Sequence, residues 1–555
     1  MMAQSEALGV LHLTQPENIK MTEAKQRMVV TMSEHIAMAL SNLRLHETLR
    51  SQSIRDPLTG LFNRRFMEES LELEIRRASR NQRPLGGGAG CVGVTMLLMV
   101  LMAAPAVSAP MPPVSPMKPY QAPPRQEWEL SNGMKVVLVT DRRYPMVTAR
   151  LALRSGSAAV GREDAGLVDA MAELLTDGTA QRSSKAIADA ADEFGGRISA
   201  SADADDVVLG SYCLSEYGDK MFGLLSEVAR TPSFPETEVA LRKKNMQEEL
   251  NVERSEPDFL AGVAFYKKLF GAHPYAVTAP TDASIRRLDR ARIVKTHKRL
   301  FTPRNALLVL VGDLGFDQAK ALVSRSFGSW KGEPGPPAAP AAPAHPRLRR
   351  VYVVDRPGSV QVSLILGNLA MREDHPDYFN FLLANQVLGG SFSSRLVSDI
   401  RESKGYTYRI GSRIQTWLTA GVFRVRTPVR NEVVEPALEA IIGHLDRIRH
   451  KKVTAEELVQ AKNYLAGSFA RSLETQEGLA SALLRLKLHR LPDDYLDTFV
   501  AKVQAVEAAG VLRAAETFIR PEEMVVVAVG DAAKIKDAAG RFSSEPVMLA
   551  GPDGD

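Results

Sequence analysis

The 555-residue sequence predicts an α+β fold of two homologous domains, each a largely antiparallel sheet with helices packed on one face. A helical N-terminal extension is expected to precede them. The first observation is that apolar strands alternate with long helical runs. Strands are expected at 135–139, 306–311, 351–354 and 524–529, and helices at 184–193, 236–254 and 455–473. The second observation is that this pattern occurs twice, with a Pro/Ala-rich segment between the two copies.

Three pairs of segments indicate that the two halves are repeats. The strand at 148–156 corresponds to 360–367, the Arg-Glu-Asp triplet at 162–164 to 372–374, and the strand at 306–313 to 524–531. The same order recurs at offsets of roughly 210 to 220 residues, which chance does not readily produce. Each half is then of normal domain size.

The predicted organisation has seven segments, separated where the composition changes. Proline-rich stretches indicate extended linkers. The segments are a helical region at 1–50, a fragment at 51–88, an apolar segment at 89–109, a linker at 110–125, the first domain at 126–331, a linker at 332–347 and the second domain at 348–550.

Composition excludes several classes of function. The chain is 45% hydrophobic and 24% charged, with a net charge of +5, as is typical of soluble globular proteins. Because the small charge predicts no clustered basic face, we expect no nucleic-acid partner. With only Cys91 and Cys213, neither a disulfide framework nor a thiolate metal site is expected.

The N-terminal segments resemble part of a bacterial signalling protein. Residues 24–50 contain no Gly or Pro and carry an apolar face, which predicts an amphipathic helix. The sequence from Arg55 to Arg65 resembles the opening signature of diguanylate cyclase (GGDEF) domains, and the helix before it resembles the end of a GAF domain. The Gly-Gly-Asp-Glu-Phe signature itself is absent. We interpret 1–88 as a fragment from a fusion or a mis-joined gene start, with a genuine helical tether as the alternative.

The apolar segment bears on cellular location. Residues 94–109 are apolar and end in small residues, with Arg77, Arg80 and Arg83 ahead of them. About fifteen apolar residues are short for a membrane span but suit the core of a secretory signal, although its position ninety residues into the chain is unusual. We therefore expect the periplasm or cell envelope of a bacterium, either after cleavage or with 94–108 as a membrane tether.

One helix in the first half has the frame of a metal site without its ligands. A Gly-Leu pair at 166–167 and a Gly-Thr pair at 178–179 enclose Asp169, Ala172 and Glu173. This stretch resembles the active-site helix of the insulinase, pitrilysin and mitochondrial-processing-peptidase family of zinc metallopeptidases, whose motif is H-x-x-E-H. The resemblance implies zinc ligands at positions 169 and 173 and the general base at 172.

The residues present do not supply that chemistry. Ala172 cannot accept a proton, and Asp169 and Glu173 offer hard oxygen ligands where catalytic zinc usually has imidazole. The resemblance places the third ligand at Glu249, which is retained. We expect no cofactor in this chain. Asp169, Glu173 and Glu249 could form a weak cation site, or they could be solvated or mutually bonded carboxylates.

The second half carries a different signature. The loop at 388–396 leads into Ile400-Arg-Glu-Ser-Lys-Gly-Tyr-Thr-Tyr408, which resembles the arginine–tyrosine element of the same family. The resemblance implies that Arg401 and Tyr408 hold the substrate backbone and stabilise an oxyanion. The alternative is a surface arginine and a strand tyrosine without a role in binding.

These observations predict the non-catalytic, substrate-binding subunit of a heteromeric endopeptidase that processes peptides or unfolded protein. A sister subunit with an intact H-x-x-E-H would supply the zinc. One alternative is a pseudoenzyme scaffold or peptide-binding protein without a protease partner, and another is a membrane-tethered signalling fusion. Retention of Arg401 and Tyr408 favours the first hypothesis, because a scaffold gives no reason to keep them.

Overall fold

The computed structural model describes residues 2–3, 6–7, 120–332 and 340–555 and divides the chain into two compact units, Met1–Pro116 and Met117–Asp555. In the first unit, strands β1 (Met2–Ala3) and β2 (Glu6–Ala7) pair antiparallel. The predicted helix in 1–50, the 51–88 fragment and the apolar segment lie outside the described residues and stay predictions. No helix within the described residues is long and apolar enough to cross a membrane.

The first half of the second unit forms a six-stranded sheet of order β3-β4-β8-β5-β7-β6, in which only β4 and β8 are parallel. Its strands are β3 (Arg125–Glu129), β4 (Lys135–Thr140), β5 (Met146–Leu153), β6 (Arg197–Ala202), β7 (Val207–Leu214) and β8 (Ala306–Gly312). Its helices are α4 (Leu167–Glu173), α5 (Ser184–Glu193), α6 (Gly218–Arg230), α7 (Glu236–Glu253), α8 (Pro257–Phe270), α9 (Asp282–Arg287), α10 (Arg290–Leu300) and α11 (Phe316–Phe327).

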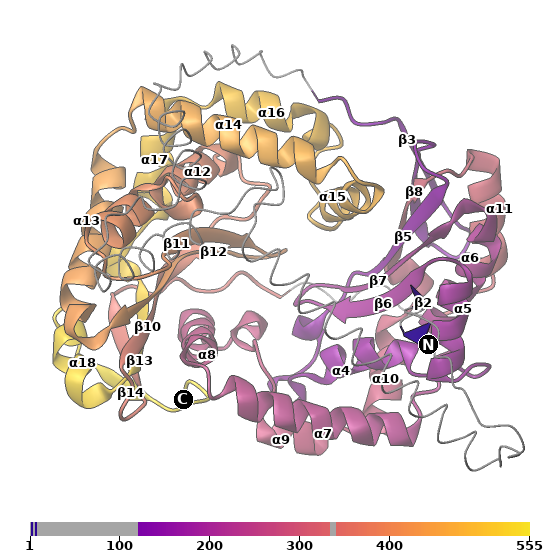
Figure 1. The fold of residues 1–555 in the computed structure, drawn as a ribbon, viewed down its shortest axis with the longest axis horizontal. Helices are drawn as coiled ribbons and strands as arrows, with labels where there is room; N and C mark the ends of the chain where they lie inside the picture. Colours follow the sequence, from indigo (N-terminus) through magenta and orange to yellow (C-terminus); the bar gives the residue numbers. More distant parts are fainter. Residues whose placement is uncertain (1, 4–5, 8–119, 333–339) are drawn as a thin grey trace, which may run out of the picture. The chain divides into compact units, whose positions relative to one another are not determined.

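The second half repeats this arrangement in a six-stranded sheet of order β11-β12-β10-β13-β9-β14 (Figure 1). Its strands are β9 (Arg350–Asp355), β10 (Gln361–Ala370), β11 (Gly411–Thr416), β12 (Gly421–Arg430), β13 (Val525–Gly530) and β14 (Met548–Ala550). Its helices are α12 (Tyr378–Asn385), α13 (Val434–His450), α14 (Ala455–Ser472), α15 (Gln476–Leu488), α16 (Tyr495–Ala505), α17 (Ala508–Phe518) and α18 (Ala532–Gly540). Five strands of each sheet correspond in order and direction, which confirms the duplicated α+β fold.

The predicted elements agree with the structure except at two helix ends. The helix expected to end near Gly178 stops at Glu173 and continues as a single 3-10 turn, η3 (Leu174–Thr176). The corresponding helix in the second half ends at Asn385 and continues as a π-helix, η7 (Gln386–Gly390).

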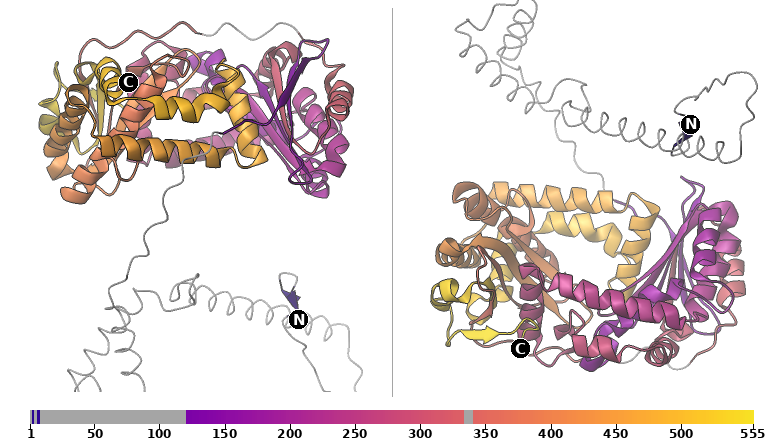
Figure 2. Two further views of the ribbon diagram at one scale, coloured as in Figure 1. Left: turned by 90° about the horizontal axis from the view of Figure 1, so that it is seen from above. Right: turned by 60° about the horizontal axis from the view of Figure 1, so that its bottom comes forward.

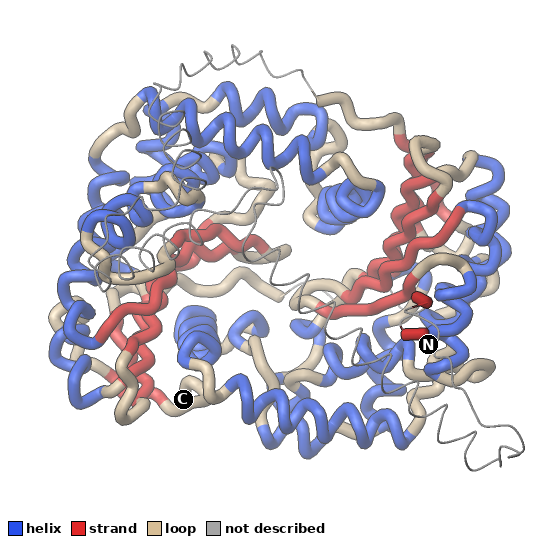
Figure 3. The backbone as a smooth tube through the Cα atoms, in the orientation of Figure 1, coloured by secondary structure: helices blue, strands red, loops and turns tan. Residues whose placement is uncertain are grey.

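Each sheet has its own helices on one face and a helix from the other half on the opposite face (Figures 1 and 3). Helix α8 belongs to the first half in sequence, yet Leu260 and Phe265 on it are buried against β10 and β13. In exchange, α15 places Leu479 and Leu483 against β5 and β8 of the first sheet. Because a fully buried Leu or Phe contributes about 1.5–3 kcal/mol, this exchange joins the halves into one unit.

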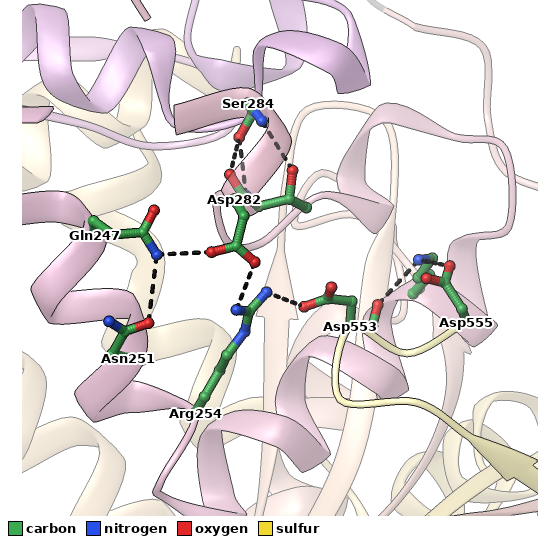
Figure 4. Close-up of polar contacts among 9 residues, drawn as sticks. Gln247, Asn251, Arg254, Asp282, Ser284, Asp553 and Asp555 are labelled. Carbon is green, nitrogen blue, oxygen red and sulfur yellow. Dashed lines mark hydrogen bonds and ion pairs between the residues drawn. The ribbon is translucent and has the colours of Figure 1, made fainter. Parts of the chain in front are cut away.

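Polar contacts of the C-terminal tail add to this joining (Figure 4). The Arg254 guanidinium, at the end of α7, donates to Asp282 Oδ2 and to Asp553 Oδ1, both at 2.7 Å. Lys267 on α8 pairs with Asp555. The C-terminal tail therefore adds ion pairs with α7 and α8 to the apolar contacts between the halves.

Elsewhere, α14 and α16 lie side by side and extend the second half (Figure 2).

Candidate functional site

A cavity of about 900 Å³, which we call the central cavity, lies between the two halves. The first half contributes Asp169 and Glu173 from α4 and Arg242 and Glu249 from α7. The second half contributes residues of β11 and β12 and the turn between them, among them Arg424. Asp169 and Glu173 of the degenerate motif predicted from the sequence therefore line a cavity.

An arginine stands between two of the three carboxylates of this motif. Arg242 Nη2 donates to Glu173 Oε1 at 2.9 Å, and its Nη1 donates to Glu249 Oε1 at 2.9 Å and Oε2 at 3.1 Å. The guanidinium is nearly buried, whereas the two carboxylates are about half exposed. An internal cation therefore bridges two of the three positions that the family resemblance assigns to metal ligands. Neither sequence alternative for these carboxylates included such an arginine.

Burial raises the pKa of Asp169 above its usual range, and the nearby Asp203 adds to this effect while Arg242 opposes it. Among the described residues no ion pair joins Asp169. Burial also raises the pKa of Glu173, with Arg242 again opposing the shift. Burial therefore works against the ionisation of both carboxyls, and Arg242 favours it.

The residue at the position of the expected general base is buried and does not reach the cavity. Ala172 is 0% exposed and belongs to the apolar core of the first half, so its methyl group does not line the cavity. The start of the helix is fixed by Gly166, whose φ of 82° favours glycine. A Cβ there would lie 2.9 Å from Met246 Cε and 2.9 Å from Pro280 Cβ. The chain therefore forms the helix of the motif with its packing, but the side chain at position 172 cannot transfer a proton.

These residues do not fit a catalytic zinc ion. Catalytic zinc requires three protein ligands and an open position for water. Here two carboxylates are occupied by a guanidinium and imidazole is missing from positions 169 and 173. Throughout 120–332 and 340–555, no three His, Cys, Asp or Glu side chains are grouped to hold a metal ion.

Arg401 and Tyr408 lie together at a different cavity of about 660 Å³, the arginine–tyrosine cavity. Arg401 belongs to a π-helix, η8 (Val397–Ser403), and its guanidinium carbon lies 4.6 Å from the ring centre of the exposed Phe392. This geometry is a cation–π contact. Tyr408 is 89% exposed. Both groups are therefore presented for contact with another molecule.

The loop that carries this pair is anchored at both ends. Asp399 accepts from His444 Nε2 at 2.9 Å and pairs with Lys404. Burial opposes ionisation of Asp399, but these two contacts hold its pKa below the usual range. Thr407 Oγ1 donates to the Pro428 carbonyl of β12 at 2.5 Å. The backbone around Arg401 and Tyr408 is thus positioned while their polar ends stay available.

Family comparisons match both halves of the chain. The insulinase (peptidase family M16) model covers residues 135–276, and the model described as the peptidase M16 inactive domain covers 287–465. Together these ranges include the degenerate motif and the arginine–tyrosine element. The chain belongs to the insulinase family, M16.

Known proteins resemble this M16 chain over most of its second unit. The crystal structure of a peptidase M16 inactive domain from Pseudomonas fluorescens is 29% identical, with a TM-score of 0.70, covering 73% of this chain and 98% of that one. A relative from Bacillus subtilis named uncharacterized zinc protease YmxG is 23% identical, covering 69% of this chain and 92% of the relative. A Helicobacter pylori relative named non-peptidase homolog YmxG is 22% identical, covering 67% and 87%.

The structure brings some predicted site residues of this M16 chain together and separates others. Asp169, Glu173 and Glu249 share the central cavity, whereas Arg401 and Tyr408 line a cavity with no residue in common with it. Arg242 belongs to no motif and was not predicted from the sequence. It precedes Glu249 by seven residues, which places both side chains on one helix face two turns apart. That spacing is a weak signal, because contact with Glu173 depends on how α4 packs against α7.

Proposed function

We propose that this chain is the non-catalytic, substrate-binding subunit of a heteromeric M16 endopeptidase acting on peptides or unfolded protein. The observation that carries the proposal is the availability of Arg401 and Tyr408 at a cavity separate from the degenerate motif. Within the described residues, Tyr408 has no hydrogen-bond partner and Arg401 has only Glu402 at 3.4 Å as an ion pair. A pair presented in this way supports a role in contacting a bound molecule.

A cation and a phenol at one site suit an extended peptide. The guanidinium can bind a backbone carbonyl through two donors, and the phenol can donate to an oxygen that gains charge in the reaction. Phe392 beneath the guanidinium limits its rotation, which lowers the entropy lost on binding. The proposed role is therefore to hold and polarise substrate, while a sister subunit with an intact H-x-x-E-H supplies the zinc and the base.

The proposed site of action is outside the bacterial cytoplasm, in the periplasm or cell envelope. This part rests on the apolar segment 94–109 and its small-residue end. An envelope location suits a subunit that processes exported or unfolded chains.

Reconstitution tests the proposal. The full chain is purified alone, a sister M16 chain with H-x-x-E-H from the same organism is purified alone, and the two are then mixed. We expect a stable complex in size-exclusion chromatography and cleavage of unfolded casein at a rate at least about tenfold above either subunit alone, because the complete site needs both groups. Absence of a complex, or full activity of the sister chain alone, contradicts the proposal and favours the scaffold alternative.

A further inference from the structure

Two arginines on the second sheet face each other without a carboxylate between them. Arg413 on β11 is directly opposite Arg424 on β12 in the antiparallel register. Directly opposite residues project from the same face of a sheet, and like charges in such pairs are destabilising. Across the described residues, neither Arg413 nor Arg424 makes an ion pair. The fold therefore maintains a local excess of positive charge here.

Two neighbouring arginines differ from this pair, because a carboxylate balances their positive charge. Arg426, two residues along β12, has its Nη2 3.2 Å from Asp258 Oδ2 and donates to the Asp258 carbonyl at 2.8 Å. Arg409 also pairs with Asp258. Asp258 lies at the start of α8 and serves both of these side chains. The chain thus supplies an acid for Arg409 and Arg426 but leaves Arg413 and Arg424 without one.

The side chain of Arg424 is held in place at the wall of the central cavity. Its Nη1 donates to Tyr266 Oη at 2.6 Å, and Tyr266 in turn donates to Gln415 Oε1 at 2.8 Å. Arg424, Tyr266 and Gln415 all line this cavity. Burial lowers the pKa of Arg424 from its usual value, and the adjacent arginines lower it further. A partly desolvated, oriented guanidinium is a suitable binder for an anion.

The surroundings of Arg424 select the kind of anion. The opposite wall of the central cavity carries Asp169, Asp203 and Glu253. These carboxylates disfavour polyanions such as nucleic acids or polyphosphates, because like charges in one cavity repel each other. A single carboxylate on an otherwise neutral or basic peptide meets less of that repulsion than a polyanion does, and it suits the planar fork of arginine. The cavity volume of about 900 Å³ admits a side chain with several flanking residues.

One face of β12 connects the two cavities. Every second residue of β12 lies on this face, namely Arg424, Arg426, Pro428 and Arg430. Pro428 and Arg430 also line the arginine–tyrosine cavity. Six residues separate Arg424 from Arg430, which corresponds to about 20 Å of strand. An extended peptide spanning both cavities would place roughly six residues between the two contact points.

We propose that Arg424 binds a side-chain or terminal carboxylate of the peptide substrate in the central cavity, with the adjacent Arg413 adding positive charge beside it. The inference rests on the proposed peptide-binding function and adds a specificity determinant to it. Substrates would carry an acidic group about six residues from the segment contacted by Arg401 and Tyr408.

Calorimetry with a matched peptide pair tests this inference on the full chain. The probes are a twelve-residue peptide with blocked ends and one glutamate as its sole charge, and a twin with glutamine at that position. We expect the glutamate peptide to bind about tenfold or more tightly, as charge-assisted hydrogen bonds contribute about 1.5–3 kcal/mol. Arg424→Gln should abolish that preference, and Arg413→Gln should reduce it.

The exposed Arg447 provides a matched control, because Arg447→Gln changes the net charge equally and should keep the preference. Equal binding of both peptides by the unmodified chain overturns the carboxylate site and leaves the proposed function standing. Binding of neither peptide overturns both. A preference that survives in Arg424→Gln places the recognition elsewhere and also overturns the inference. Thermal unfolding of Arg413→Gln adds an independent measurement, since relief of the like-charge pair should raise the Tm.

Discussion

Arg401→Ala and Tyr408→Phe should each slow casein cleavage by the reconstituted heteromer by about 10²–10³, the typical cost of removing one preorganised oxyanion donor. The expected loss is in kcat, because these groups are proposed to act on charge that develops during the reaction. Assembly should be unaffected, since Tyr408 is 89% exposed and neither side chain belongs to the apolar core. Steady-state kinetics and size-exclusion chromatography on the same preparations measure both quantities.

Two surface substitutions control for this experiment. Tyr464→Phe on α14 removes the hydroxyl of another exposed tyrosine, and Arg447→Ala removes an exposed arginine of α13. Both controls should retain the activity of the unmodified heteromer. If the Arg401 and Tyr408 variants also retain it, the pair has no role in the reaction and the scaffold alternative becomes the better account.

Replacement of Arg242 should have the second large effect, on metal affinity. In an Asp169→His, Glu173→His variant, the two imidazoles and Glu249 form a ligand set of the kind that holds catalytic zinc. We expect weak zinc binding while Arg242 remains, because its guanidinium pairs with Glu249 and repels the incoming ion. Adding Arg242→Ala should tighten zinc binding by about 10²–10³, since a unit charge about 4 Å away is worth about 4 kcal/mol in a partly screened site.

Arg242→Lys on the same background is the matched control, because it keeps a cation and should leave zinc binding weak. Competition with a chromogenic chelator measures all three affinities. Equal affinity with and without Arg242 would contradict the conclusion that this guanidinium occupies the metal position. Peptidase activity should not return in any of these variants, because Ala172 remains in the core and supplies no base.

The elements of the fold could be predicted because their signals are local. The apolar run at 306–311 and the long polar–apolar pattern at 236–254 gave β8 and α7 nearly to the residue. The exchange of α8 and α15 between the halves could not be predicted, because it depends on packing between segments that lie far apart in the sequence. Periodicity shows that a helix has a buried face but does not identify which sheet covers it.

Site residues that belong to a motif could be predicted from the sequence, whereas those outside a motif could not. Asp169, Ala172 and Glu173 were located from the frame of two glycine-containing pairs, and Glu249 from its helix. Arg242 and Arg424 belong to no motif. Their roles follow from contacts with other elements, such as Glu173 on α4 and Tyr266 on α8, which sequence spacing does not specify. The electrostatic partners of these arginines could therefore be identified only from the structure.

We propose that this M16 chain lacks metal catalysis of its own and acts through its substrate-binding groups. The most direct test is the zinc content of the purified full chain by atomic spectrometry, with hydrolysis of unfolded casein followed on the same sample. We expect far less than one zinc per chain and no hydrolysis that a chelator abolishes, because Arg242 pairs with Glu173 and Glu249 and Ala172 replaces the base. One zinc per chain together with chelator-sensitive cleavage would contradict it.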